Sequence, residues 1–369
     1  MTKRRIFLGA AAVATAGGAI AQSKSEPSQR KPAVELKFQS AFVGDSMNDL
    51  MATRFAEFVN AAGGSRVHMA MLPADSMAKS GDLMDVVNSG RLDGVFDTPY
   101  NWSSKHAAVG LWGANPTFGM NGHVMSAWHY YGGGKELLNE IYQAMGVDVV
   151  SFPCVALPTK PLGWFKKPVT KVGDLAGLRF RVGGLAAEVM KELGIDPVNV
   201  PGTEIASALQ VGKLDGAEWN DVSSDRAINL RSGILHCMLQ SFHEPATMLE
   251  VLISKKRWAT LPADVQAILE NAAHMVSETG FEEFAHKNAI DYEKLVREGA
   301  SFFKSPQSVL HAQLNAWDKV IQRRSAADPL FAKVVSSQRD FARRAVKWKM
   351  SVDVDYRIAH NYYSRLARA

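Results

Sequence analysis

Two stretches of the sequence resemble each other: Gly90-Arg91-Leu92-Asp93-Gly94-Val95 and Gly212-Lys213-Leu214-Asp215-Gly216-Ala217. Each follows a short run with helical spacing, at 83–87 and 205–211, and each leads into a stretch with the composition of a buried strand. A chance match is the alternative for so short a stretch. The shared order of helix, turn and strand favours a repeat, and it predicts two similar α/β lobes.

The residues around the first stretch predict alternating strands and helices. Apolar side chains recur every three or four residues from Asp45 to Val59, and Gly63-Gly64 follows as a helix end. Val67, Met69 and Met71 then alternate with other residues as they do in a strand. This alternation predicts a parallel α/β sheet covered by helices in each lobe, with a cleft between the lobes.

Candidate ligand contacts follow the predicted strands. In open α/β sheets a ligand binds beyond the carboxyl ends of the strands. The residues at those places are Asp97-Thr98-Pro99-Tyr100-Asn101-Trp102 and Glu218-Trp219-Asn220-Asp221. Aromatic walls with a few fixed polar groups suit a small polar ligand. We therefore expect a ligand to contact Tyr100, Asn101, Glu218, Trp219 and Asn220.

A third element is Gly177-Leu178-Arg179-Phe180-Arg181-Val182-Gly183-Gly184, in which apolar residues alternate with two arginines. In a strand this spacing places both arginines on one face. A guanidinium with its planar fork of donors is the natural partner of a carboxylate in a dry site. The alternation alone leaves open which arginine faces the cleft, and also whether both are surface residues of an edge strand.

Composition and missing motifs exclude several classes of protein. With 47% apolar and 21% charged residues the chain is globular. Its net charge of +5 includes three basic residues of a leader without acids, so the rest is nearly balanced and no nucleic-acid partner is expected. The sequence has no P-loop, no zincin motif and no nucleophile elbow. We therefore expect no enzyme and no catalytic residues.

The first 33 residues read as an export signal and a tether. Residues 1–21 carry Lys3-Arg4-Arg5, an apolar stretch too short for a permanent anchor, and Ala19-Ile20-Ala21, the order of a cleaved signal peptide. The paired arginines indicate the twin-arginine route, so the mature protein is expected in the periplasm. Residues 22–33 form a polar tether. Cys154 and Cys237 form either one disulfide or two buried thiols, and the sequence does not decide between them.

Several motifs, in this order, resemble those of the solute-binding proteins of tripartite ATP-independent periplasmic (TRAP) transporters. They are Ala127-Trp128-His129-Tyr130-Tyr131-Gly132-Gly133-Gly134-Lys135-Glu136-Leu137-Leu138-Asn139-Glu140, Gly163-Trp164-Phe165-Lys166-Lys167, the arginine stretch 177–184, and Asp215-Gly216-Ala217-Glu218-Trp219. The resemblance extends from about Val34 to beyond Leu310 and fits best the branch that binds 2-oxo acids.

The resemblance implies an α/β, two-lobed periplasmic binding protein fold with a long interdomain helix and a helical C-terminus. Lobe I would comprise 34–155 with part of 247–305 returning to it, lobe II 156–246, and the C-terminal helices 306–369. Such a receptor closes on a small organic acid and delivers it to the membrane subunits of the transporter. The branch forms dimers through swapped C-terminal helices, and an apolar seam fits a homodimer: Phe331, Val334, Val335, Phe341 and Trp348.

The resemblance also implies roles in the site. The arginine at the position of Arg181 pairs with the ligand carboxylate, while Glu218 and Trp219 help hold a bridging sodium or calcium ion. Trp164 and Glu244 complete the expected ligand contacts. The family has a glutamine four residues before Trp164, where this chain has Lys160.

Lys160 puts the metal ion in question, because a charged lysine offers only donors and cannot ligate a metal. We therefore expect no cofactor, with the Lys160 ammonium replacing the cation beside Glu218. The alternative is that Lys160 points to solvent between Pro158 and Pro161.

Further departures concern the identity of the ligand. The family has a tyrosine at the position of Asn101, and Asn220-Asp221 and His243 also differ from its pattern. The expected ligand is a 2-oxo acid or related monocarboxylate. Alternatives are a receptor for a polyol or another ligand that is not a keto acid, and a periplasmic enzyme or sensory binding protein that reuses the fold.

Overall fold

The computed structural model describes residues 34–230 and 233–366. The predicted signal peptide and tether lie outside the described residues.

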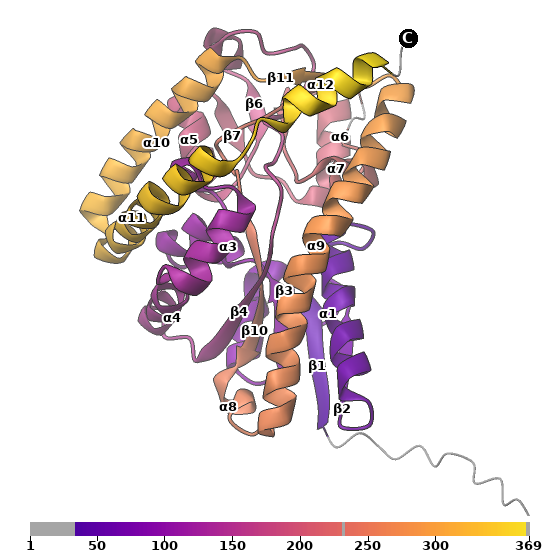
Figure 1. The fold of residues 1–369 in the computed structure, drawn as a ribbon, viewed down its shortest axis with the longest axis vertical. Helices are drawn as coiled ribbons and strands as arrows, with labels where there is room; N and C mark the ends of the chain where they lie inside the picture. The colour runs from indigo at the N-terminus through magenta and orange to yellow at the C-terminus, as the bar shows by residue number, and fades with distance from the viewer. Residues whose placement is uncertain (1–33, 231–232, 367–369) are drawn as a thin grey trace, which may run out of the picture. The chain divides into compact units, whose positions relative to one another are not determined.

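The first sheet has five strands in the order β2-β1-β3-β10-β4 (Figure 1). These strands are β1 (Val34–Ser40), β2 (Val67–Leu72), β3 (Gly94–Asp97), β4 (Val149–Ala156) and β10 (Met248–Ser254). β1 runs parallel to β2 and β3, but β10 is antiparallel to both of its neighbours. The expected parallel sheet is therefore confirmed for β1, β2 and β3 but wrong for β10, which makes the sheet mixed. β4 leads out of this sheet toward the second one, and β10 returns from there, so the two run in opposite directions.

The second sheet has six strands in the order β11-β9-β5-β8-β6-β7. They are β5 (Gly163–Phe165), β6 (Arg179–Arg181), β7 (Asp196–Val198), β8 (Gly216–Ala217), β9 (His236–Leu239) and β11 (Ser301–Lys304). β6 is parallel to β7 and β8, whereas β5 is antiparallel to β8 and β9. The two sheets confirm the α/β, two-lobed fold.

Helices cover the sheets and form the C-terminal part of the described chain (Figure 1). They are α1 (Met47–Gly63), α2 (Leu83–Asn88), α3 (Gly122–Tyr131), α4 (Gly134–Ala144), α5 (Gly184–Glu192), α6 (Ile205–Gln210), α7 (Val222–Ala227), α8 (Lys255–Trp258), α9 (Ala263–Arg297), α10 (Gln307–Ala327), α11 (Pro329–Val352) and α12 (Tyr356–Leu366).

The repeated stretch has the same local structure in both lobes. Gly90 follows α2 with φ 75°, and Gly212 follows α6 with φ 72°. This left-handed backbone favours glycine, because a Cβ would strain it. The turns then lead into β3 and β8, which both lie inside their sheets.

Two segments connect β4 to β5 and β9 to β10, and they lie side by side. The N–H of Leu157 donates to the carbonyl of Thr247 at 2.7 Å, and the N–H of Lys160 to that of Glu244 at 3.3 Å. We call these segments, 157–162 and 240–247, the paired connections. The 35-residue helix α9 contacts α1 and β4 of one lobe and α7 of the other (Figure 1), as a helix crossing both lobes should.

The C-terminal helices pack on both lobes. α10 contacts α5, and α11 contacts α3 and α4. Within the predicted seam, Phe331, Val334 and Val335 are buried by the same chain, whereas Trp348 is 69% exposed. Only the later part of the seam is therefore open to another molecule.

Cys154 and Cys237 are both buried and free, which decides between the two alternatives. Among the described helices, none has the length and apolar character needed to cross a membrane.

Candidate functional site

The paired connections and the carboxyl ends of β3, β6 and β8 surround a cavity of about 560 Å³. A cavity of this size is typical of small-molecule sites. It brings together most of the predicted ligand contacts: Tyr100, Asn101, Lys160, Arg181, Glu218, Trp219, Asn220 and Glu244.

Arg181 is the last residue of β6, and its side chain is only 14% exposed. Its Nη1 donates to Oε1 of Glu218 at 2.8 Å and to the carbonyl of Glu218 at 3.1 Å, and its Nε donates to the carbonyl of Val200 at 3.3 Å. The guanidinium carbon lies 4.9 Å from the centre of the Trp219 ring, within cation–π distance. These contacts fix the guanidinium at the cavity wall.

Arg179, two residues earlier, is the arginine that does not face the cleft, a choice that the sequence left open. Its Nε and Nη2 donate to the carboxylate of Asp215, each at 2.9 Å, and its side chain is 44% exposed. Asp215 also forms an ion pair with Lys166, whose Nζ lies 3.0 Å from Oδ1. Arg179 is not among the residues that line the cavity, so Arg181 is the arginine of the candidate site.

Lys160 points into the cavity and not to solvent. Its side chain is 10% exposed, its ammonium forms a close ion pair with Glu244, and Nζ lies 3.7 Å from Oε2 of Glu218. Two cationic and two acidic side chains thus alternate, in the order Arg181, Glu218, Lys160 and Glu244. We call these four residues the charge cluster.

The electrostatics of the cluster follow from burial and from the close charges. Burial opposes the charge of Lys160, but Glu244 and Glu218 outweigh it and hold the lysine pKa above its usual value. Burial raises the pKa of Glu218, an effect that Lys160 opposes. The pKa of Glu244 is lowered, because its contacts, above all the Lys160 ammonium, outweigh the effect of burial. The ammonium is therefore charged at neutral pH.

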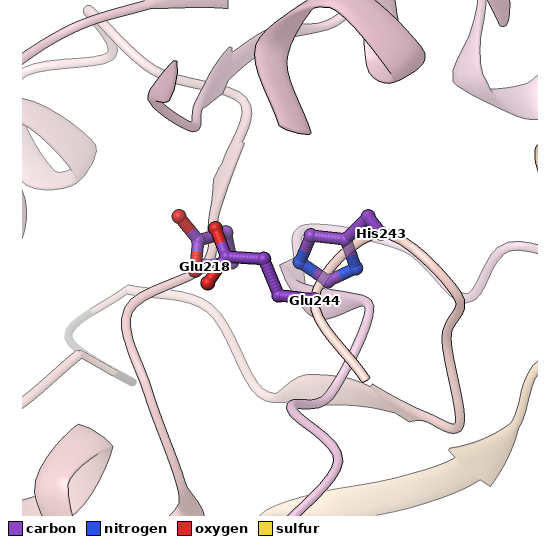
Figure 2. A group of neighbouring side chains, drawn as sticks. All are labelled: Glu218, His243 and Glu244. Carbon is purple, nitrogen blue, oxygen red and sulfur yellow. The ribbon is translucent and has the colours of Figure 1, made fainter. Parts of the chain in front are cut away.

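Glu218, His243 and Glu244 offer side-chain atoms within 4.8 Å of one another, a spacing that could hold a metal ion. Figure 2 shows the carboxylates of Glu218 and Glu244 side by side, with the ring of His243 beside Glu244. Burial lowers the pKa of His243 to about 4, so its ring is neutral at pH 7.

The residues present do not fit such an ion, because Lys160 is paired with both carboxylates. With an effective dielectric constant of about 20, two unit charges about 4 Å apart repel by about 4 kcal/mol. A metal ion between Glu218 and Glu244 would meet this repulsion from the ammonium.

Tyr100 and Asn101 line the cavity from the lobe of the first sheet. The hydroxyl of Tyr100 donates to the carbonyl of Gly183 at 2.5 Å, just beyond β6, and so joins the two lobes across the cavity. Burial and the two glutamates raise the pKa of Tyr100 well above its usual value, so the hydroxyl keeps its proton. Asn101 donates to Asp97 at 2.6 Å.

Trp164 does not line the cavity. It is buried in β5, and its Nε1 donates to Asp225 at 2.9 Å. Asp225 also accepts the N–H of Asn220 at 2.9 Å. Trp164 is therefore one contact removed from the cavity, and it supports the loop that carries Asn220.

Asn48, Asn199 and Thr247 also line the cavity, and the sequence reasoning missed them. Asn48 lies at the start of α1, which follows β1, and Asn199 directly follows β7. Tyr100 and Glu218 were identified because a ligand binds beyond the carboxyl ends of the strands. The same rule, applied to β1 and β7, would have found both asparagines.

Comparisons with known proteins agree on one family for this chain. The family profile "Bacterial extracellular solute-binding protein, family 7", called DctP, matches residues 44–327. The monocarboxylate 2-oxoacid-binding periplasmic protein of Nostoc sp. is 26% identical over 365 residues, which cover 96% of this chain and 98% of that protein.

Solved structures share the fold. A TRAP periplasmic solute-binding protein of Pseudoalteromonas atlantica, with bound sodium and pyruvate, is 27% identical with a TM-score of 0.80, over 88% of this chain and 98% of that one. A TRAP solute-binding protein of Bordetella bronchiseptica, 22% identical, has a TM-score of 0.83 over 92% of this chain and 99% of that one. That structure is a mixed-occupancy dimer with calcium and picolinate in the occupied site.

Proposed function

Because the chain belongs to family 7 of the bacterial extracellular solute-binding proteins, the DctP family, we propose that it captures a small monocarboxylate in the cavity beside Arg181. As a member of this family the chain is a TRAP-type solute receptor and not an enzyme, so the alternative of a periplasmic enzyme is not retained. The captured acid is then delivered to the membrane subunits of a TRAP transporter.

The position of Arg181 is the observation that carries the proposal. Its Nη1 and Nε are held by Glu218 and Val200, while Nη2 has no hydrogen-bond partner among the residues that the structure describes. A guanidinium held in this way has a donor left for a ligand, and a carboxylate is the acceptor that it binds most strongly. The neighbouring Lys160 supplies a second positive charge.

Aromatic and amide side chains complete the proposed ligand contacts. The ring of Trp219 covers the guanidinium of Arg181, and Tyr100 lies on the opposite lobe. The indole Nε1 of Trp219 and Oδ1 of Asn220 are buried without a hydrogen-bond partner among the described residues. A ligand that offers an acceptor to the indole N–H and a donor to the amide oxygen would satisfy both groups.

The class of acid is proposed from the relatives. The Nostoc protein is a receptor for monocarboxylate 2-oxo acids, and the Pseudoalteromonas protein holds pyruvate. We take a 2-oxo acid or a closely related monocarboxylate as the ligand of this chain. A hydroxyl in place of the 2-oxo group would suit the acceptor of Asn220.

Domain boundaries, export and assembly are part of the same proposal. The lobes comprise 34–155 with part of 247–305, and 156–246, with the C-terminal helices at 306–369. Residues 1–21 direct the chain to the periplasm by the twin-arginine route and are cleaved there. The exposed part of the seam around Trp348 supports a homodimer.

A thermal-shift panel tests the proposed function, since a ligand that binds only the native state raises the melting temperature. The mature protein is melted with 2-oxo acids, 2-hydroxy acids and dicarboxylic acids, and with polyols and sugars as controls. We expect a shift with small monocarboxylates alone. A shift with polyols and none with any acid would refute the proposal.

A further inference from the structure

We propose that the Lys160 ammonium takes the place of a metal ion in the ligand site, so that this receptor binds its acid without any bound cation. The inference rests on the proposed function and deepens it. It sets this chain apart from the Pseudoalteromonas protein, which has bound sodium and pyruvate, and from the Bordetella protein, whose active site holds calcium and picolinate.

Both carboxylates that a metal ion would need already form ion pairs with Lys160. Oε1 of Glu218 accepts from Arg181 at 2.8 Å; Oε2 of the same residue has no hydrogen-bond partner among the described residues, but it lies within ion-pair distance of the Lys160 ammonium, at 3.7 Å. Oε2 of Glu244 is paired with the same ammonium and also accepts the hydroxyl of Thr247 at 3.4 Å. A metal ion between the two carboxylates would lie against the positive charge of Lys160, which is already paired with both.

The backbone and the packing hold Lys160 in this position. The N–H of Lys160 donates to the carbonyl of Glu244, so the two residues that form the ion pair are also joined across the paired connections. Thr159, the preceding residue, donates through its hydroxyl to the carbonyl of Pro245 at 3.0 Å. The ammonium therefore does not depend on a bound ligand for its position.

The Lys160 ammonium can also do what a bridging cation does. It places one positive charge between Glu218 and Glu244, and it has three N–H donors. One of them serves Glu244, while Glu218 lies only within ion-pair distance, so donors are left for an oxygen of the ligand acid beside Arg181. Because a lysine is part of the chain, its charge is present at any concentration of salt or metal.

Wild-type protein gives the first test. It is purified with and without chelator, its metal content is measured by mass spectrometry, and it is titrated calorimetrically with pyruvate or with the acid that gives the largest thermal shift. We expect no stoichiometric ion and a Kd that changes by less than about twofold between chelator, calcium and sodium. One calcium or sodium ion per chain, or binding that chelator abolishes and calcium restores, would overturn the inference.

Two variants and a matched control give the second test. Lys160→Gln removes the charge and supplies a carbonyl oxygen, so its Kd should rise at least about tenfold in chelator and recover with calcium or sodium. Lys160→Met removes the charge without supplying an oxygen, and it should recover less. Lys166→Gln, which alters an exposed lysine paired with Asp215, should behave as wild type. A Lys160→Gln protein that binds as tightly as wild type in chelator would count against the inference.

These outcomes separate the inference from the proposed function. Failure of wild type to bind any acid, with or without metal, would refute the proposed function. The metal content of the purified protein still decides the inference in that case, since it needs no ligand. A variant that does not fold leaves the wild-type comparison as the deciding test.

Discussion

Replacing Arg181 by alanine is expected to remove most of the affinity for the acid. The guanidinium is only 14% exposed, and its Nη2 is free of other partners among the described residues, so a ligand carboxylate would meet it away from bulk water. Truncating one partner of such a hydrogen-bonded charge pair costs about 2 to 5 kcal/mol. With a factor of ten for each 1.4 kcal/mol, Kd should rise by between about 30-fold and several thousandfold.

Calorimetric titration of the purified variant measures this change, and its melting temperature without ligand shows whether it is folded. Arg179→Ala is the matched control, because Arg179 lies on the same strand but pairs with Asp215 outside the cavity. Its Kd should equal that of wild type. A folded Arg181→Ala protein with a Kd within about threefold of wild type would refute the role of Arg181.

Three other variants test separate features. Tyr100→Phe loses the hydrogen bond to Gly183 that joins the two lobes, worth about 0.5 to 1.5 kcal/mol, so calorimetry should give a Kd about 2- to 12-fold higher. An unchanged Kd would refute a role of this hydrogen bond in binding. Burial raises the pKa of Glu250 to about 6, so the folded state holds this proton more tightly than the unfolded state does. This contribution of about 2 kcal/mol is present below pH 4.5 and lost as pH rises through 6. Denaturant titrations of wild type should show this loss in the free energy of unfolding, and those of Glu250→Gln should not. Equal pH profiles for the two proteins would contradict the role of Glu250. Trp348→Asp places a charge on the exposed seam, and light scattering should show a monomer where wild type is a dimer; a monomeric wild type would refute the dimer.

The local sequence was sufficient to predict the two similar lobes and the cleft between them. Gly90 and Gly212 both need a left-handed turn, and this requirement is visible in the residue types alone. Tyr100 and Glu218 were found because the position of a ligand relative to parallel strands is a property of the sheet and not of the particular chain.

Contacts between distant residues could not be predicted in the same way. Alternation could not separate Arg179 from Arg181, because the difference lies in Asp215, 36 residues after Arg179. The resemblance to the family favours Arg181, but the residue pattern by itself does not. The partner of Lys160 presents the same difficulty, since Glu244 reaches it only because the paired connections lie side by side.

The buried carboxylate of Glu250 was also missed. Its three donors, Trp102, Tyr142 and Ser151, are 99 to 148 residues away in the chain. β10 reads as an ordinary buried strand, and nothing local indicates that it is inserted antiparallel between β3 and β4. Such an insertion depends on where the chain re-enters the first lobe, which only the tertiary structure defines.

The most direct test of the account is a crystal structure of the mature protein with the acid that gives the largest thermal shift. We predict that the ligand carboxylate accepts hydrogen bonds from the Arg181 guanidinium beside the Trp219 ring, with the Lys160 ammonium against another of its oxygens. An acid bound away from Arg181, or a ligand without a carboxylate in this cavity, would contradict the account.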